Sequence, residues 1–418
     1  MRWRNPSAPT GTGAHEATTA QLGALYPLVF SSAQRTPGVL IGQDLFGGPF
    51  CFDPFTLYES GELTNPNALL IGQIGRGKSS LIKTLLLRQI AFGRSAMVLD
   101  PKGEYAPLAR RCGAAVVSLD PAGAQRLNPL ELGGEEQLVS RLTLLDALGE
   151  RALERVLLPR ERAALEVALT SAERRVQRVP TLPDVVEALL YPQGEAAELI
   201  ATTKELLAEE GRDLGLGLRR LVTGDLRGLF DGPSTVHLNP ETPLVCLDLS
   251  ALYGSPALGL LMACATAWLQ AEIRRRASTS QRTILVLDEA WAVLREPSVA
   301  RWLQASWKLS RSWGVANVAV LHRLSDLLAV GSEGSELRQL AEGLLADSET
   351  RICYQQPPGE VAASARLLGL SDAECEVLPQ LSRGVGLWKV GGRSSLVRHL
   401  VGPRESELID TDSSMAAR

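Results

Sequence analysis

One glycine-rich stretch limits what this chain can fold into more than any other feature. Residues 67–83 read Asn-Ala-Leu-Leu-Ile-Gly-Gln-Ile-Gly-Arg-Gly-Lys-Ser-Ser-Leu-Ile-Lys. A short apolar run ends at Gly72, and after Gly77 the pair Lys78-Ser79 opens a segment whose leucines recur at helical spacing. This pattern predicts a buried strand, a tight turn and a helix. Such an arrangement presents backbone N–H groups and a helix N-terminus to an anion.

The pattern G-x-x-x-x-G-K-[ST] is the phosphate-binding loop, or P-loop, of nucleotide-binding proteins. A glycine turn that only joins a strand to a helix would look similar, but the apolar strand and the helical spacing on either side favour nucleotide binding. We expect Lys78 to reach the β- and γ-phosphates of ATP and Ser79 to offer its hydroxyl to Mg²⁺. The residues expected to contact the nucleotide are Gly72, Gln73, Ile74, Gly75, Arg76, Gly77, Lys78, Ser79 and Ser80.

A second motif supplies what the P-loop lacks. Residues 282–287 form an apolar run that ends in Asp288 and Glu289. In a P-loop fold such a pair predicts that Asp288 holds the Mg²⁺ shell and that Glu289 polarises the attacking water. The alternative is a structural role, in which the acidic pair only caps the following helix, and the intact P-loop argues against it. Glu104 is the next candidate for the base.

Phosphoryl transfer also needs positive charge at the γ-phosphate. Ring-forming NTPases often take this charge from an arginine of the neighbouring subunit. Arg311, Arg323 and Arg351 follow the acidic pair and are the candidates. His322 ends the strand expected at 316–321. It could sense the γ-phosphate or cap the sheet, and the sequence leaves both open.

The composition is that of a soluble globular enzyme, with 45% apolar and 22% charged residues among 418. A net charge of −4 excludes a globally basic nucleic-acid binder, although a local basic channel in an assembled ring would not show in this sum. Six scattered cysteines without a C-x-x-C pair predict free thiols in a reducing compartment. The longest apolar stretch, 257–269, is too short to cross a bilayer, and the start has no secretory signal, so we expect no membrane insertion.

Apolar runs that end in aspartate, at 95–100 and 114–120, alternate with helical patterns, which predicts an α/β fold with a mainly parallel sheet. From about 134 to 229 nearly every segment has helical spacing instead. We expect helices at 150–177 and 196–209, and a further helix capped by Thr181. The expected organisation is a flexible tail at 1–20, a short N-terminal β element at 21–60, the ATPase core at 61–133 and 235–405, an all-helical insertion at 134–234 and a C-terminal tail at 406–418.

The motifs also resemble a known family. Ile41-Gly42 before Asn65-Pro-Asn67, the P-loop, Asp100-Pro-Lys-Gly-Glu-Tyr105, Leu229-Phe-Asp-Gly-Pro-Ser234 and Leu287-Asp-Glu-Ala-Trp291 follow one another in an order that is similar to the HerA/FtsK superfamily of RecA-like motors. They look most like its TraC/TrbE/CagE branch, the cytoplasmic ATPases of type IV secretion and conjugative transfer. The resemblance spans about residues 38–405.

The resemblance implies a RecA-like core with a helical insertion, a homo-hexamer or other homo-oligomer, and hydrolysis between subunits, with Arg311 compared to the arginine these proteins carry. It departs at Leu321-His322, where the family usually has threonine and glutamine. Only residues 1 to about 60 stand where the branch has its long N-terminal domain, so docking to its usual membrane partners does not follow.

We therefore expect an ATP-hydrolysing motor of a type IV secretion-like or conjugative DNA-transfer apparatus. It would be cytoplasmic and peripheral to the membrane through inner-membrane secretion or transfer subunits, with DNA or protein as cargo. One alternative is a HerA/FtsK or coupling-protein type of DNA translocase, which a basic pore loop would favour. The other is an ATP-binding assembly scaffold with little turnover, to which His322 points.

Overall fold

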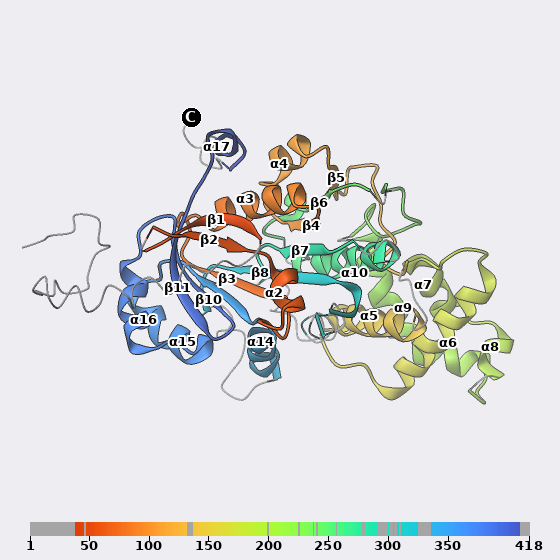
Figure 1. Cartoon of the computed structure of the whole chain (residues 1–418). Coiled ribbons are helices and arrows are strands. Elements are labelled where there is room, and N and C mark those ends of the chain that lie inside the picture. The colour runs from red at the N-terminus through yellow and green to blue at the C-terminus, as the bar shows by residue number, and fades with distance from the viewer. Residues whose placement is uncertain are drawn as a thin grey trace, which may run out of the picture. The chain divides into compact units, whose positions relative to one another are not determined.

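The computed structural model describes residues 38–409, apart from 46, 132–136, 199, 225, 237, 240, 256, 278–280, 291–299, 301–303, 305–306, 309–310 and 325–335. The described chain forms two compact units (Figure 1). Unit 1 holds residues within 38–94, 316–324 and 344–409. Unit 2 holds residues within 95–315 and 336–343. The tail expected at 1–20 and the first part of the β element expected at 21–60, up to residue 37, lie outside the described residues.

The strands of unit 1 surround a parallel centre. Their order is β2-β1-β11-β10-β9-β3-β8, and β3 pairs in parallel with β9 and β8, whereas the other pairs are antiparallel. All residues of β3 and β8 are buried, as parallel core strands require. The bounds are β1 Val39–Asp44, β2 Pro49–Phe52, β3 Ala68–Ile71, β8 Val315–Leu321, β9 Thr350–Cys353, β10 Val385–Val390 and β11 Arg393–His399.

The helices of unit 1 follow from local sequence signals. Asp53 caps α2 by accepting the N–H groups of its first turn, and α3 begins directly at the P-loop lysine. The last helix, α17, includes 406–409, the first four residues of the C-terminal tail expected at 406–418, and 410–418 lie outside the described residues. The bounds are α2 Pro54–Glu59, α3 Lys78–Ala91, α15 Pro358–Leu368, α16 Asp372–Val377, η3 Leu378–Gln380 and α17 Pro403–Ile409.

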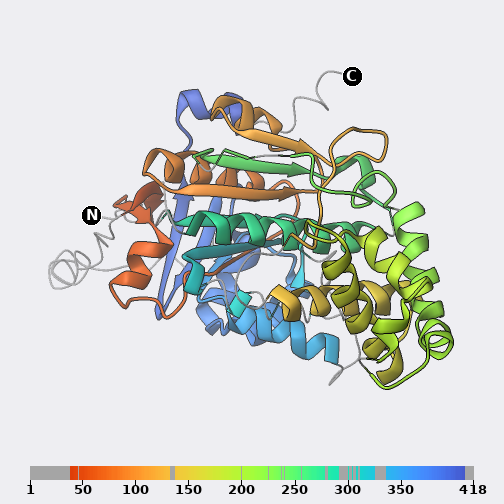
Figure 2. The same cartoon turned by 90° about the vertical axis from the view of Figure 1, so that its right-hand side faces the viewer.

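The strands of unit 2 are all parallel, in the order β7-β4-β6-β5. The long apolar helix α10, Leu258–Ala277, runs alongside them (Figure 2). The strand bounds are β4 Ser95–Asp100, β5 Ala115–Ser118, β6 Leu244–Asp248 and β7 Thr283–Leu287, and the short helices are α4 Ala106–Arg111, η1 Ser250–Leu252 and η2 Arg311–Trp313. The predicted fold class, α/β with a mainly parallel sheet, is confirmed. Because parallel strands end at the same edge, residues that follow β4, β6 and β7 gather there.

A group of helices separates β5 from β6 in the chain and clusters together in unit 2 (Figure 1). The predicted cap at Thr181 is confirmed, since its N–H donates to the carboxylate of Asp184 at 2.7 Å. The bounds are α5 Gln137–Leu153, α6 Pro159–Arg175, α7 Leu182–Leu190, α8 Gly194–Glu198 and α9 Lys204–Thr223, while α14 Glu336–Ala346 follows later in the chain.

Two helix predictions in this group are wrong. The helix expected at 150–177 is two helices, because α5 ends at Leu153 and α6 begins only at Pro159. Proline has no N–H to donate and starts a helix far more readily than it continues one. The helix expected at 196–209 is also broken, between the end of α8 and the start of α9.

Candidate active site

The P-loop of unit 1 folds back on its own lysine. Gly72, Gly75 and Gly77 have φ angles of +155°, +79° and +107°, which only glycine adopts without strain. Lys78 opens α3 and is 5% exposed. Its Nζ donates to the carbonyl oxygens of Gly72 at 2.5 Å and of Gln73 at 3.2 Å. The loop therefore encircles one ammonium group.

The neighbouring strand β9 braces this loop. The N–H of Gln73 donates to the carbonyl oxygen of Gln355, just beyond β9, at 3.1 Å. A Cβ on Gly72 would lie 2.5 Å from the Cβ of the fully buried Tyr354. No side chain larger than hydrogen fits at position 72 unless β9 shifts, so the loop's shape is imposed by packing as well as by its own torsion angles.

The residues of this loop fit a nucleoside triphosphate with Mg²⁺. The first turn of α3 contains no acidic side chain, and no side chain caps its N-terminus. The partial positive charge of the helix end and the ammonium of Lys78 thus act together on any anion at the loop. Ser79, in the same turn, is half-buried and carries a hydroxyl of the kind that binds Mg²⁺.

Unit 2 contains the acidic pair, directly after β7. Asp288 is 6% exposed and Glu289 is 2% exposed. Glu289 has φ +53°, a left-handed conformation that few non-glycine residues take. Its N–H donates to Oδ1 of Asp288 at 3.0 Å. Burial raises the pKa of Asp288 to about 6, and the charge of Glu289 adds to the rise.

The loop after β4 contributes two partners that the sequence did not predict. Lys102 forms an ion pair between its Nζ and Oε1 of Glu289. The fully buried Tyr105 donates its hydroxyl to Oδ2 of Asp288 at 3.2 Å. Burial acts to lower the pKa of Lys102, but the hydrogen bond and charge of Glu289 outweigh burial, so the pKa is raised. Each acidic side chain thus has its own partner from one loop.

A single buried carboxylate orders that loop. Oδ1 of Asp100 accepts the N–H groups of Lys102 and Glu104 at 3.3 and 3.1 Å, and Oδ2 accepts the N–H of Tyr105 at 2.8 Å. Burial raises the pKa of Asp100, although the bonds from Tyr105 and Glu104 oppose the rise. Glu104, the alternative base, is half-buried in this loop, and its charge helps to raise the pKa of Asp288.

A signal for these partners was present in the sequence. The runs that became β4 and β7 both end in aspartate, and the two strands pair in parallel with Leu99 opposite Leu287. Residues that follow neighbouring parallel strands meet at one sheet edge. The sequence did not reveal that β4 lies beside β7, and without this strand order the partners of the acidic pair could not be predicted.

The remaining candidates from the sequence are three arginines and His322. Arg311 begins η2, and its side chain lies outside the described residues. His322 follows β8 in unit 1 and is half-buried, and Arg323 is exposed. Arg351, in β9, donates to the carbonyl oxygens of Ser348 at 3.2 Å and Leu368 at 2.9 Å, which gives it a structural role. Roles for Arg311 and His322 stay predictions.

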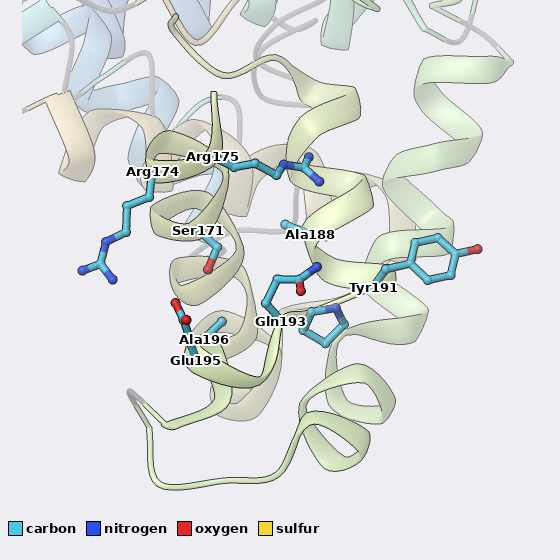
Figure 3. Close-up of a pocket in the computed structure, with 9 residues that line it drawn as sticks. Ser171, Arg174, Arg175, Ala188, Tyr191, Gln193, Glu195 and Ala196 are labelled. Carbon is cyan, nitrogen blue, oxygen red and sulfur yellow. The ribbon is translucent and has the colours of Figure 1, made fainter. Parts of the chain in front are cut away.

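A hollow of about 380 Å³ lies among α6, α7 and α8. Figure 3 shows its two arginines, Arg174 and Arg175, pointing away from each other. Arg175 pairs instead with Glu187 at 2.8 Å. The polar groups do not converge on one point, so this hollow has less of the character of a ligand site than the strand ends do. In the parts of the chain that the structure describes, no cluster of metal-binding side chains is found.

Comparison with known proteins supports the same reading of the motifs. A family model described as an AAA-like domain matches residues 59–229. The type IV secretion system protein CagE of Helicobacter pylori is 24% identical over 175 residues, which are 42% of this chain. The chain spans only 16% of the length of that relative.

Two solved structures share the fold. VirB4 of Thermoanaerobacter pseudethanolicus superposes with a TM-score of 0.73 at 24% identity, covering 88% of this chain and 98% of that one. The plasmid coupling protein TrwB, in complex with ADP and Mg²⁺, gives a TM-score of 0.58 at 13% identity over 96% and 97% of the two chains. The RecA-like fold is thereby confirmed, as is the resemblance to the secretion and conjugation ATPases at the level of domain and distant homologue. None of the described helices is both long and apolar enough to span a bilayer.

Proposed function

We propose that this chain, which carries an AAA-like domain and shares the fold of VirB4, hydrolyses ATP to drive a type IV secretion-like or conjugative transfer apparatus. The observation that carries the proposal is the glycine loop folded around Lys78 at the start of α3. A turn that only connected two elements would need neither three glycines in the left-handed region nor a buried lysine among its carbonyl groups.

The residues divide the work in the following way. Lys78 and the loop amides bind the phosphates, while Ser79 and Asp288 hold the Mg²⁺. A Mg²⁺ ion held there would neutralise charge that develops on the transferring phosphoryl group. Glu289 accepts a hydrogen bond from the attacking water and orients it. Glu104 and His322 are secondary candidates for the base and for sensing the γ-phosphate.

Assembly and location are part of the same proposal. The chain acts as a homo-hexamer or other homo-oligomer, with Arg311 completing the site of a neighbouring subunit. It works at the cytoplasmic face of the membrane, held there by inner-membrane subunits of the apparatus. DNA or protein is the cargo.

Two substitutions test the division of work. Lys78→Ala should weaken ATP binding about 10- to 100-fold, because a charged hydrogen-bond donor to the phosphates is lost. Glu289→Gln should keep binding and lower turnover by about 10²- to 10⁴-fold, because only the water is affected. Binding of a fluorescent ATP analogue and release of phosphate measure the two effects separately.

A matched control is Lys204→Ala, since Lys204 is also the first residue of a helix but is exposed on α9. It should change neither quantity. Full turnover in Glu289→Gln would remove this residue from the base role and leave Glu104. Repeating the assay with single- and double-stranded DNA separates a DNA translocase, which DNA should stimulate, from a motor that acts on other cargo.

A further inference from the structure

We propose that Lys102 is a positioning residue for Glu289, and that the β4–α4 loop holds the glutamate in its working orientation through this ion pair. The inference rests on the proposed function, because it assigns Glu289 to the attacking water. It concerns a residue that is outside the P-loop and outside the acidic pair.

Burial makes a partner for Glu289 necessary. The side chain is 2% exposed, and a buried carboxylate without a cation is costly. Lys102 supplies that cation from the loop after β4, with its own side chain 26% exposed. The pair is therefore closed to solvent on the glutamate side and open on the lysine side.

Three features restrain Lys102, two through the backbone of its loop and one through its ammonium group. Asp100 accepts the N–H of Lys102 itself. Gly103 has φ +72°, and a Cβ there would lie 3.2 Å from the Cβ of Ser250, so the loop packs closely on the next strand end. The ring of Tyr253 lies 5.8 Å from Nζ. The loop backbone and the Tyr253 ring thus restrain the lysine independently of the glutamate.

The backbone conformation of Glu289 needs support from neighbouring residues. Its φ of +53° is a conformation that persists only where the surroundings hold it. The N–H of Glu289 is bound to Asp288, whose other carboxylate oxygen accepts from Tyr105. One loop therefore holds both acidic side chains, and Lys102 is the member that contacts the glutamate.

The experiment compares the wild type with Lys102→Ala and Lys102→Arg. In Lys102→Ala we expect kcat to fall about 10- to 100-fold, since a misplaced catalytic group costs that much, while affinity for a fluorescent ATP analogue stays within about twofold. Lys102→Arg keeps the charge and should restore most of the turnover. The control is Lys389→Ala, which breaks another Lys–Glu pair, with Glu374 at 2.9 Å, and should leave kcat unchanged.

A second measurement needs no nucleotide. Urea unfolding of Lys102→Ala, Glu289→Gln and the double variant tests whether the two side chains are coupled. Lys102→Ala should lower the unfolding midpoint more in the wild-type background than in the Glu289→Gln background. Equal shifts would mean that the pair does not exist in solution and would overturn the inference.

The kinetic outcomes are equally decisive. If kcat is unchanged in Lys102→Ala, the positioning role is overturned. It is also overturned if kcat falls as far in Lys102→Arg as in Lys102→Ala. A rise in kcat also overturns it, because the lysine would then restrain the glutamate. A wild-type protein that neither binds nor turns over ATP would instead contradict the proposed function, while the unfolding experiment would still decide on the ion pair.

Discussion

Among the described residues, three that are not glycine have positive φ angles: Glu154, Ala201 and Glu289. The first two lie in the breaks after α5 and α8, and the third is the proposed base. None of the three positions holds glycine, so their positive φ angles could not be predicted from the sequence. The P-loop shows the opposite case, in which glycine stands wherever φ is positive.

Two of those glycines differ in a way that can be measured. Gly72→Ala should destabilise by about 1–3 kcal/mol from overpacking against Tyr354, in addition to backbone strain. Gly75→Ala has nothing within 4 Å of the added Cβ and should lose only about 1–2 kcal/mol from its torsion angle. Thermal unfolding of both variants checks the order. Equal melting temperatures would contradict the contact between the loop and β9.

At the scale of elements, α3 ties the P-loop to the edge of unit 1. Its last turn carries Arg88, which binds Glu405 of α17 through two hydrogen bonds of 2.8 and 2.6 Å and the carbonyl oxygen of Leu400 at 2.6 Å. One turn earlier, Thr84 Oγ1 lies 2.7 Å from Nε2 of His399 in β11. The helix thus contacts the loop, the last strand and the last helix of the unit.

This arrangement predicts a pH dependence of stability. Burial, with a contribution from the Arg88 charge, lowers the pKa of His399 to about 4 from 6.5. The unfolded chain therefore binds the proton first as pH falls. The stability contributed by the neutral imidazole is complete above about pH 6.5 and is lost towards pH 4, at about 1.4 kcal/mol per pKa unit. His399→Gln should flatten that part of the curve in urea unfolding from pH 4.5 to 7.5. Parallel curves would show that His399 titrates normally.

The sequence predicted elements better than it predicted their neighbours. The P-loop strand, the strand before Asp288 and the cap at Thr181 all have local signals, and all were found. Lys102 and Tyr105 were missed because their importance depends on β4 lying beside β7. Strand order is a property of long-range packing, which hydrophobic periodicity in a single segment does not record.

At the scale of the molecule, the P-loop belongs to unit 1 and the acidic pair to unit 2. In the proposed ring, an arginine from a neighbouring copy would complete the nucleotide site. The proposed ring makes this arrangement testable through the behaviour of mixed subunits.

Arg311→Ala and Lys78→Ala should each be inactive alone, because one lacks the arginine given to its neighbour and the other lacks the lysine that contacts the phosphates in its own site. In an equimolar mixture, random assembly should recover about a quarter of the wild-type turnover, since each competent interface needs one intact half from each variant. Phosphate release across mixing ratios measures the recovery. If activity stays absent at every ratio, either the site is complete within one chain or Arg311 does not act there.

Strand pairing in unit 1 has a consequence for how the protein is made. Gly42 of β1 lies opposite His399 of β11, and β3 lies between β8 and β9. At ordinary rates of translation, roughly 20 to 70 s separate the synthesis of these first and last strands. The strands of unit 2 all leave the ribosome within that interval and can pair before it ends. The P-loop strand β3 therefore lacks its partners β8 and β9 until late in synthesis, and we expect its edges to be prone to aggregation during that time.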